Sequence, residues 1–479
     1  MGRVTSFGDE VAISFDTVRA NFAQLFDPAI RLGVTGLSRA GKTVFITSLV
    51  HNLLHGGRLA LFDVVSERRM TDAQLRPQPD DGVPRFQYEE HLRALVEERV
   101  WPVSTRAISQ LRLTVRFESA SGWTRRFGAG QLSIDIVDYP GEWLLDLPLL
   151  GKDYDTWAEE TVTLSREPGR AALAAGWHAV LDAHDPDAQA TDVAAQRHHA
   201  AFADYLTRCR EDAAALSTLP PGRFLMPGDM EGSPALTFAP VPGAPGEPLR
   251  DMMERRYEAY KRLVVKPFFR DHFARLDRQI VLVDALQAMN AGGPAVADLE
   301  GALADILGCF NPGRRAFLAS LFTVKTDRIL FAATKADHLH HENHDRLERI
   351  LARLVDRARK SAEFAGAQVD AIALAALRAT REGTVEHDGE ELPVIVGTPL
   401  AGEVVDGRTF DGETRTAVFP GDLPKDPAAV LDRDLKPGDL RFVRFRPPRI
   451  ERSAEGLELS LPHIRLDRAL QFLLGDRLA

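Results

Sequence analysis

Residues 36–43 are of the types and spacing that bind a polyphosphate. They read Gly-Leu-Ser-Arg-Ala-Gly-Lys-Thr, a complete GxxxxGK[ST] phosphate loop. The glycines let successive backbone N–H groups point at phosphate oxygens, Lys42 can reach the β and γ oxygens, and the Thr43 hydroxyl can ligate Mg2+. The residues predicted to contact the nucleotide here are Gly36, Ser38, Arg39, Ala40, Gly41, Lys42 and Thr43.

A second motif, Asp138-Tyr139-Pro140-Gly141, follows the alternating apolar run 132–137. In a chain that also contains a phosphate loop, the Asp138 carboxylate can hold Mg2+ through water. The Gly141 N–H can sense a γ-phosphate because no side chain obstructs it. An ordinary turn after a strand is the alternative interpretation of this motif.

A third motif, Thr334-Lys335-Ala336-Asp337, directly follows the apolar run 329–333. Guanine presents N1–H and the N2 amino group on one edge, and a single carboxylate can accept from both, whereas adenine lacks this pair of donors. We therefore predict that Asp337 selects guanine and that the stem of Lys335 lies across the base. A loop lysine and an exposed aspartate are the alternative.

These motifs can meet only if a sheet brings the ends of several strands together. After Lys42 the apolar residues recur at helical spacing, so the loop has a strand before it and a helix after it. Helical patterns also separate several later strands, which predicts an α/β fold with one doubly wound, mainly parallel sheet. The predicted strands are 30–34, 111–117, 132–137, 280–283, 329–333 and 371–374.

The remaining segments suggest two additions to this sheet. Residues 1–142 and 279–392 are predicted to form a P-loop domain in two segments, interrupted by a mainly helical insertion at 143–278. The insertion is rich in alanine and charged residues and contains a Pro/Gly-rich passage at 219–248. Residues 393–479 are predicted to form a small β-rich unit closed by a helix. Its β-like runs are 394–396, 417–419 and 440–445, and its helix is 465–478.

The bulk composition narrows the class of protein. A chain of 479 residues with 44% hydrophobic content can bury a large core, and its net charge of −10 disfavours nucleic acid as a partner. The two cysteines, Cys209 and Cys309, provide neither a disulfide framework nor zinc-ligand spacing. Without a signal-peptide pattern, we expect a cytoplasmic protein. No stretch approaches the about 20 apolar residues of a spanning helix, so any membrane contact is expected to be peripheral.

The three motifs in this order, each at the carboxyl end of a strand, resemble the G domain of translation-factor-like GTPases. More narrowly, the loop together with Asp-Tyr-Pro-Gly-Glu-Trp and Thr-Lys-Ala-Asp resembles the YcjX family of bacterial stress-associated GTP-binding proteins. The strings at 101–106, 283–287 and 396–400 add to a resemblance that covers nearly the whole chain. It implies a G domain with helical insertions and an extra C-terminal part. It also implies GTP and GDP binding with Mg2+, and a link to envelope or phage-shock stress.

The resemblance also assigns roles to single residues. Lys335 and Asp337 match the base-reading motif, whose first position is Thr334 where many relatives have Asn, and Ala376-Leu377-Arg378 is a loose counterpart of the last base-contacting motif. The residues expected to act in catalysis are Lys42, Thr105, Gly141 and Glu142, and those expected to hold the metal are Thr43, Thr105 and Asp138. Glu142 occupies the position of a water-orienting Gln, and a salt-bridged surface Glu is the alternative.

Several of these assignments stay open. Thr105, with Ser104 as runner-up, is the expected switch I residue, although the pair can equally cap a helix. Arg39 and Arg106 are candidate internal arginine fingers, and Asp284 rivals Asp138 as the metal-binding acid.

Two segments outside the motifs have ordinary interpretations that we favour. The histidine cluster at 338–344 is interpreted as a solvated helix start rather than a metal site. The amphipathic stretch 346–360 is expected to pack on the sheet, with contact to acidic lipid as the alternative.

The combined prediction is a GTP-binding protein that hydrolyses GTP slowly and signals its state through Thr105, Gly141 and the insertion. Its partner is an unidentified protein effector, with membrane-associated stress proteins as candidates. An ATP-dependent kinase or motor is the rival, and a module that binds guanine nucleotide without hydrolysis is a third possibility.

Overall fold

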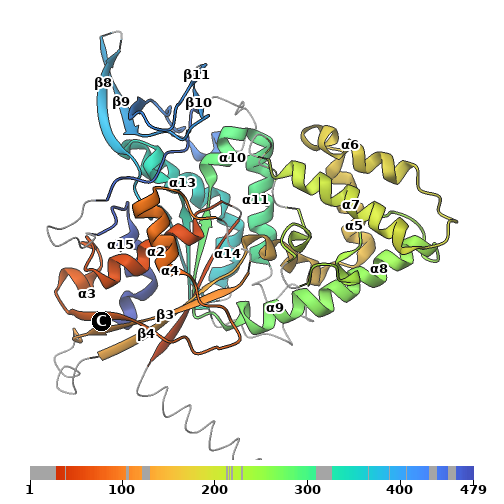
Figure 1. The fold of residues 1–479 in the computed structure, drawn as a ribbon, viewed down its shortest axis with the longest axis horizontal. Helices are drawn as coiled ribbons and strands as arrows, with labels where there is room; N and C mark the ends of the chain where they lie inside the picture. Colours follow the sequence, from red (N-terminus) through yellow and green to blue (C-terminus); the bar gives the residue numbers. More distant parts are fainter. Residues whose placement is uncertain are drawn as a thin grey trace, which may run out of the picture.

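The computed structural model describes residues 28–479 apart from several short gaps. The gaps are 38, 104–106, 121–129, 212–213, 215, 217–218, 228–229, 309–325, 365, 388, 406, 431–439 and 451–459. A seven-stranded sheet with the order β2-β3-β4-β1-β5-β6-β7 forms its centre (Figure 1). The strands are β1 (Ala29–Gly36), β2 (Met70–Arg76), β3 (Ser109–Phe117), β4 (Gly130–Asp138), β5 (Arg278–Val283), β6 (Arg328–Ala333) and β7 (Gln368–Ala373).

The sheet is parallel from β4 to β7 and antiparallel at the β2-β3 edge. This confirms the predicted α/β class. Each of the six strands predicted for this sheet is present, and the one described strand of the sheet that the sequence missed is β2, at its edge. The register aligns Val34 of β1 with Asp138 of β4 and with Ile280 of β5. The carboxyl ends of these strands therefore meet at one edge, where ligands bind in open α/β sheets.

Helices cover both faces of the sheet, and the alternation of side chains along the strands explains why. Ile280 and Leu282 contribute to a core with α2 and α15, while Val281 and Val283 contribute to a second core on the opposite face. The helices of the sheet domain are α2 (Lys42–Leu54), α3 (Asp63–Ser66), α4 (Tyr88–Arg93), α10 (Ala285–Ala291), α11 (Gly293–Gly308), α13 (His344–Leu354), α14 (Asp356–Phe364) and α15 (Leu466–Leu474). The amphipathic stretch 346–360 falls in α13 and α14, and α13 packs against β6 and β7.

The segment between β4 and β5 forms a group of helices at one side of the sheet (Figure 1). Its helices are α5 (Tyr154–Ser165), α6 (Pro168–Asp182), α7 (Asp192–Cys209), α8 (Pro248–Tyr260) and α9 (Lys266–Asp271). Aromatic rings fill its interior: Trp157 stacks on Tyr257 at 5.0 Å between centroids, and Trp177 stacks on Tyr205 at 5.3 Å. These rings belong to the same continuous core as β5 and α11, so the insertion is packed onto the sheet domain.

The C-terminal region contains a small antiparallel sheet in the order β12-β9-β8 and a two-stranded ribbon, β10-β11. The strands are β8 (Arg381–His387), β9 (Glu390–Gly397), β10 (Val404–Val405), β11 (Arg408–Thr409) and β12 (Thr416–Val418). The run 440–445 was expected to be β-like but forms a single bridge, Pro399 to Phe445, and contributes apolar side chains to the core of this unit instead.

The last helix, α15, leaves the β-rich unit and packs on the central sheet. Leu470 and Leu473 are fully buried among residues of β1 and β5, and the buried Arg278 of β5 donates to the Leu473 carbonyl at 3.1 Å. The division of the chain at 142, 278 and 392 stays a prediction, and the β8-β9 hairpin crosses the last of these boundaries. Among the described residues, the structure contains no helix that is both long and apolar enough to cross a bilayer.

Candidate functional site

The phosphate loop joins the end of β1 to the start of α2. Gly36 has φ of 154° and its Cα lies so close to β5 that an added Cβ would be 2.6 Å from the Leu282 carbonyl oxygen. Gly41 precedes α2, whose N-terminus has no capping side chain among the described residues. The first backbone N–H groups of a helix have no partner within the helix and form a natural anion site. The loop is thus shaped for phosphate by its own backbone.

The ammonium group of Lys42 is held by the backbone of the loop itself. Lys42 is buried, and its Nζ donates to the Gly36 carbonyl oxygen at 3.0 Å. Thr43 is also buried, at the first turn of α2. Arg39 has φ of 62° and an exposed side chain. Ala40 is buried, and Ser38 lies outside the described residues.

The Asp138 motif lies directly against this loop. A Cβ on Gly141 would fall 1.7 Å from the Gly36 carbonyl oxygen, so only glycine permits the contact. Asp138 is 1% exposed at the end of β4, beside Val34 of β1. The structure therefore brings together the phosphate loop and the predicted metal acid, which are about a hundred residues apart in sequence.

Glu142 does not point into solvent. It is 4% exposed and forms an ion pair with Arg210, which follows the last turn of α7 in the insertion. The backbone of Gly222 packs on the same residue, because a Cβ there would lie 1.8 Å from the Glu142 carbonyl oxygen. The residue predicted to orient water is thus engaged by the insertion, and its catalytic role stays a prediction.

The segment after Glu142 is embedded in the insertion as well. It forms the 3-10 helix η3 (Gly141–Gly151), in which Asp146 accepts hydrogen bonds from the Tyr260 hydroxyl at 2.6 Å and the Gly222 N–H at 2.7 Å. Burial raises the pKa of the Asp146 carboxyl to about 6, although these hydrogen bonds act in the opposite direction. The guanidinium of Arg223 lies over the Trp143 ring at 3.3 Å. The segment that begins at Gly141 is therefore anchored to the insertion by these contacts.

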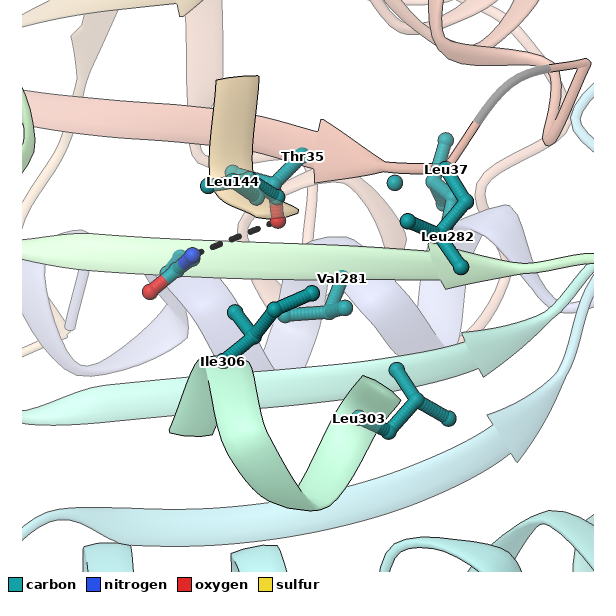
Figure 2. Close-up of a pocket in the computed structure, with 9 residues that line it drawn as sticks. Thr35, Leu37, Leu144, Val281, Leu282, Leu303 and Ile306 are labelled. Atoms are coloured by element: carbon teal, nitrogen blue, oxygen red, sulfur yellow. Dashed lines mark hydrogen bonds between the residues drawn. The ribbon is translucent and has the colours of Figure 1, made fainter. Parts of the chain in front are cut away.

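An apolar pocket lies behind the phosphate loop (Figure 2). Leu37 from the loop, Leu144 from η3, and Leu303 and Ile306 from α11 line it. Gln279 Nε2 donates to the Thr35 hydroxyl at 3.2 Å along its wall. Leu37 and Leu144, from the loop after β1 and from the segment after Gly141, thus share one mainly apolar pocket.

The third motif follows β6 at the same edge of the sheet. Lys335 is in the left-handed region with φ of 62°, and its ammonium forms an ion pair with Asp284. Asp284 also accepts from the Gln287 N–H at 3.2 Å at the start of α10. In this structure the rival metal acid Asp284 therefore caps a helix and fixes Lys335. Thr334 donates from its backbone N–H to the Val283 carbonyl at 2.9 Å.

Asp337 contacts residues just after the segment Ala376-Leu377-Arg378 that was predicted to complete the base site. It is 4% exposed, and its Oδ2 accepts from the Ala379 N–H at 2.8 Å. The Thr380 hydroxyl donates to the Asp337 backbone carbonyl. Burial raises the pKa of the Asp337 carboxyl to about 6. Asp337 is thus joined to the loop after β7, at residues a little beyond the predicted Ala376 and Leu377, whose contact with a base stays a prediction.

Some of the predicted site residues lie away from the three motifs, and others fall outside the residues that the structure describes. Ser104, Thr105 and Arg106 are outside the described residues, so the switch I prediction is untested. Leu377 is buried in a small apolar cluster with Leu461 rather than facing the base motif.

The histidine cluster is not the solvated helix start that the sequence predicted. His338, His340 and His344 are 5–8% exposed, and only His341 is open to solvent. Burial lowers the pKa of His338 to about 3, and its ring packs on Phe445. The sequence interpretation was wrong because a run of polar residues gives no sign that the β-rich unit covers it.

The sheet is that of an α/β fold compatible with a P-loop GTPase, and the three motifs follow the ends of its strands in the order 36–43, 138–141 and 334–337. The model of the YcjX-like family, DUF463, matches residues 30–478, and the chain belongs to this family. The Ras-like GTPase YcjX of Escherichia coli (strain K12) is 40% identical over 468 residues, which cover 94% of this chain and 96% of the relative. The Ras-like GTPase YcjX of Shewanella oneidensis (strain MR-1) is 34% identical over 484 residues, which cover 94% of this chain and 95% of the relative.

The Asp146 contacts predict a pH dependence of stability. The pKa of this carboxyl rises from 3.8 to about 6 on folding, so the folded state binds the proton more tightly. Its ionisation therefore destabilises the fold progressively as pH rises from about 4 to about 6. Asp146→Asn cannot ionise; its amide oxygen can still accept from the Gly222 N–H, while its amide N–H can donate to the Tyr260 hydroxyl oxygen. Relative to the unchanged protein, the variant should gain about 2 kcal/mol of unfolding free energy between pH 4 and pH 7.

Urea unfolding at three pH values across this window measures the effect. Asp204→Asn, at an exposed position of α7, is the control and should show no such trend. A difference between Asp146→Asn and the unchanged protein that is constant with pH would contradict the prediction.

The Glu142–Arg210 pair predicts a strong effect of removing one partner. Arg210→Ala leaves a buried carboxylate without its cation and should lower the unfolding free energy by about 3 kcal/mol. Arg208→Ala breaks an exposed pair with Asp204 on the same helix and should cost less than about 1 kcal/mol. Adding Glu142→Gln to Arg210→Ala should restore part of the loss, because no charge is then buried alone. Equal effects of the two arginine substitutions would show that the pair does not hold the insertion.

Proposed function

We propose that this protein binds GTP and GDP with Mg2+, hydrolyses GTP slowly and acts as a molecular switch. The observation that carries the proposal is the meeting of three motifs at one sheet edge. These are the phosphate loop, Asp138 with Gly141, and Lys335 with Asp337. The names of the relatives, Ras-like GTPases, support the same nucleotide.

The phosphate end of the site has the donors that a triphosphate and its metal need. Lys42 can exchange the Gly36 carbonyl for a phosphate oxygen, since both lie at the mouth of the same loop. Thr43 and Asp138 offer a hydroxyl and a carboxylate, and hard oxygen ligands of this kind fit Mg2+. When bound, the metal supplies charge neutralisation at the β and γ phosphates.

The base end of the site favours guanine. The Asp337 carboxylate uses one hydrogen bond for Ala379 and has further lone pairs on both oxygens for the N1–H and N2 donors. Above pH of about 6 it is ionised and accepts only, which matches guanine and not adenine. The ion pair to Asp284 fixes the stem of Lys335 at the same strand end.

The switch itself would act through Gly141. In hydrolysis a water oxygen bonds to the γ phosphorus while the bond to the β-phosphate oxygen breaks, giving GDP and phosphate. Because Gly141 touches Gly36 and continues into η3, a γ-phosphate that draws its N–H must move Glu142 and Asp146 against the insertion. We infer that the insertion presents the nucleotide state to a protein effector. The association with envelope or phage-shock stress follows from the family resemblance alone.

One observation favours a second candidate, a module that holds guanine nucleotide without useful hydrolysis. Glu142, which follows the Asp138 motif, is buried and paired with Arg210, so it is not poised to orient water. The two candidates share the nucleotide and differ in turnover.

The guanine assignment predicts a change of base preference. Asp337→Asn should weaken GDP binding by about 100-fold or more and improve xanthosine diphosphate binding, because the amide can donate where the carboxylate could only accept. Titrations of both diphosphates and of ATP, with and without Mg2+, measure this. Asp356→Asn, at a surface position of α14, is the control. An unchanged preference in Asp337→Asn would show that this residue does not read the base.

The hydrolysis assignment predicts slow phosphate release. With GTP and Mg2+ in excess, we expect a turnover on the order of 10⁻⁴ to 10⁻² per second, typical of sites without an external arginine finger. Lys42→Ala should abolish it, since the phosphate end loses its cation. Tight GTP binding with no release over hours would instead select the non-hydrolysing module.

A further inference from the structure

We propose that the turn at His340, His341 and Glu342 binds a transition-metal ion of the Zn2+ class, separate from the Mg2+ of the nucleotide site. The three side chains each offer a ligand atom, and these atoms lie within 4.8 Å of one another. The inference stands on this geometry and does not depend on the proposed nucleotide.

Hydrogen bonds hold the backbone that carries the three donors. The 3-10 helix η10 (His341–Asn343) begins directly after His340, and the Asn343 N–H donates to the His340 carbonyl at 2.9 Å. The Asn343 side chain is anchored in turn to the β-rich unit, donating to Asp422 at 2.9 Å and accepting from the Leu423 N–H at 3.0 Å. Donors on a braced turn lose little conformational freedom on binding an ion.

His340 is the residue that points most clearly to a ligand. Its side chain is 8% exposed, and its Nδ1 is buried without a hydrogen-bond partner among the described residues. Leaving a buried polar atom unsatisfied costs about 1–3 kcal/mol, so native structures rarely retain one without a reason. An imidazole nitrogen that meets no protein donor or acceptor is available to a metal ion.

His341 already has the second interaction that metal-binding histidines show. Its Nδ1 lies 2.7 Å from the Glu382 carboxylate of β8, which leaves Nε2 as the ligand atom. A carboxylate behind an imidazole fixes the tautomer and raises the basicity of the ligating nitrogen. The rings of His340 and His341 are 4.3 Å apart between centroids, and each ring has a ligand atom within 4.8 Å of the other's.

The donor set selects the class of metal. Two imidazoles and one carboxylate suit Zn2+ and its neighbours, whereas Mg2+ and Ca2+ prefer oxygen alone. In a tetrahedral site with bonds of about 2.1 Å, ligand atoms are about 3.4 Å apart, so small rotamer changes of the exposed His341 and Glu342 bring the three together. Three protein ligands leave one position open to water.

The turn is connected to the candidate base loop by a chain of hydrogen bonds. Glu382 accepts from Arg378 at 3.0 Å, and Arg378 donates to the Thr380 carbonyl at 3.0 Å. Thr380 donates in turn to the Asp337 backbone. An ion that orders His341 and Glu382 would therefore stiffen the loop that contacts Asp337.

Calorimetric titration of metal-free full-length protein with Zn2+, in millimolar Mg2+, tests the proposal. We expect a single strong site per chain that Mg2+ does not block. His340→Ala should weaken Zn2+ binding by at least about tenfold, as should His341→Ala. Glu382→Gln, which removes no ligand, should weaken it by about 10- to 100-fold. His55→Ala, an exposed histidine at the end of α2, is the matched control and should bind as the unchanged protein does.

Circular dichroism and the thermal midpoint of each variant establish that it is folded. Zn2+ binding that is equally strong in the His340→Ala/His341→Ala double variant would place the metal elsewhere and overturn the proposal. So would the absence of Zn2+ binding by the unchanged protein. Because the readout is metal binding alone, these failures are distinct from a failure of GTP binding.

Discussion

The structure depends on the contact between the backbone of Gly141 and the carbonyl oxygen of Gly36, which leaves no room for a side chain. That carbonyl is also the acceptor for Lys42, so the first glycine of the phosphate loop, its lysine and the glycine of the second motif form one unit. The contact requires β4 and β1 to be neighbours with aligned ends, as the parallel register provides. A ligand that binds to this loop and takes up Lys42 would therefore also change the surroundings of Gly141.

Buried carboxylates surround this unit, and each is held by a group from another part of the chain. Arg210 pairs with Glu142, Tyr260 donates to Asp146, and Lys335 pairs with Asp284. Burying a carboxylate is unfavourable unless such partners are present, and removing one partner is more damaging than removing both. These interactions thus fix where the insertion and the base loop lie. The pair with Arg210 also keeps Glu142 buried and engaged, which fits the slow turnover that we propose.

The sequence predicted those features that depend on local spacing. The phosphate loop and six strands have short-range signatures, namely glycine positions and runs of apolar residues. β2 was missed because only Ala73 and Leu75 alternate with polar residues in MTDAQLR, and an irregularity after Met70 breaks the period. The partners of the site residues had no such signature: Arg210 is 68 residues from Glu142, and Asp284 is 51 residues from Lys335. Only the packed chain brings them together, and the same holds for the buried histidines next to Asp337.

Two different units pack against the two ends of the proposed nucleotide site, the helical insertion and the β-rich C-terminal unit. At the phosphate end the insertion contacts Glu142 and Asp146, whereas at the base end the β-rich unit contributes Phe445 against His338 and Glu382 near the base loop. A guanine nucleotide that spans both ends would make the positions of the two additions depend on each other, because its affinity includes contacts at each end. Such coupling needs no direct contact between the insertion and the β-rich unit. It requires only that all three motifs lie at one edge of the sheet. One ligand at that edge would then affect both the insertion and the β-rich unit.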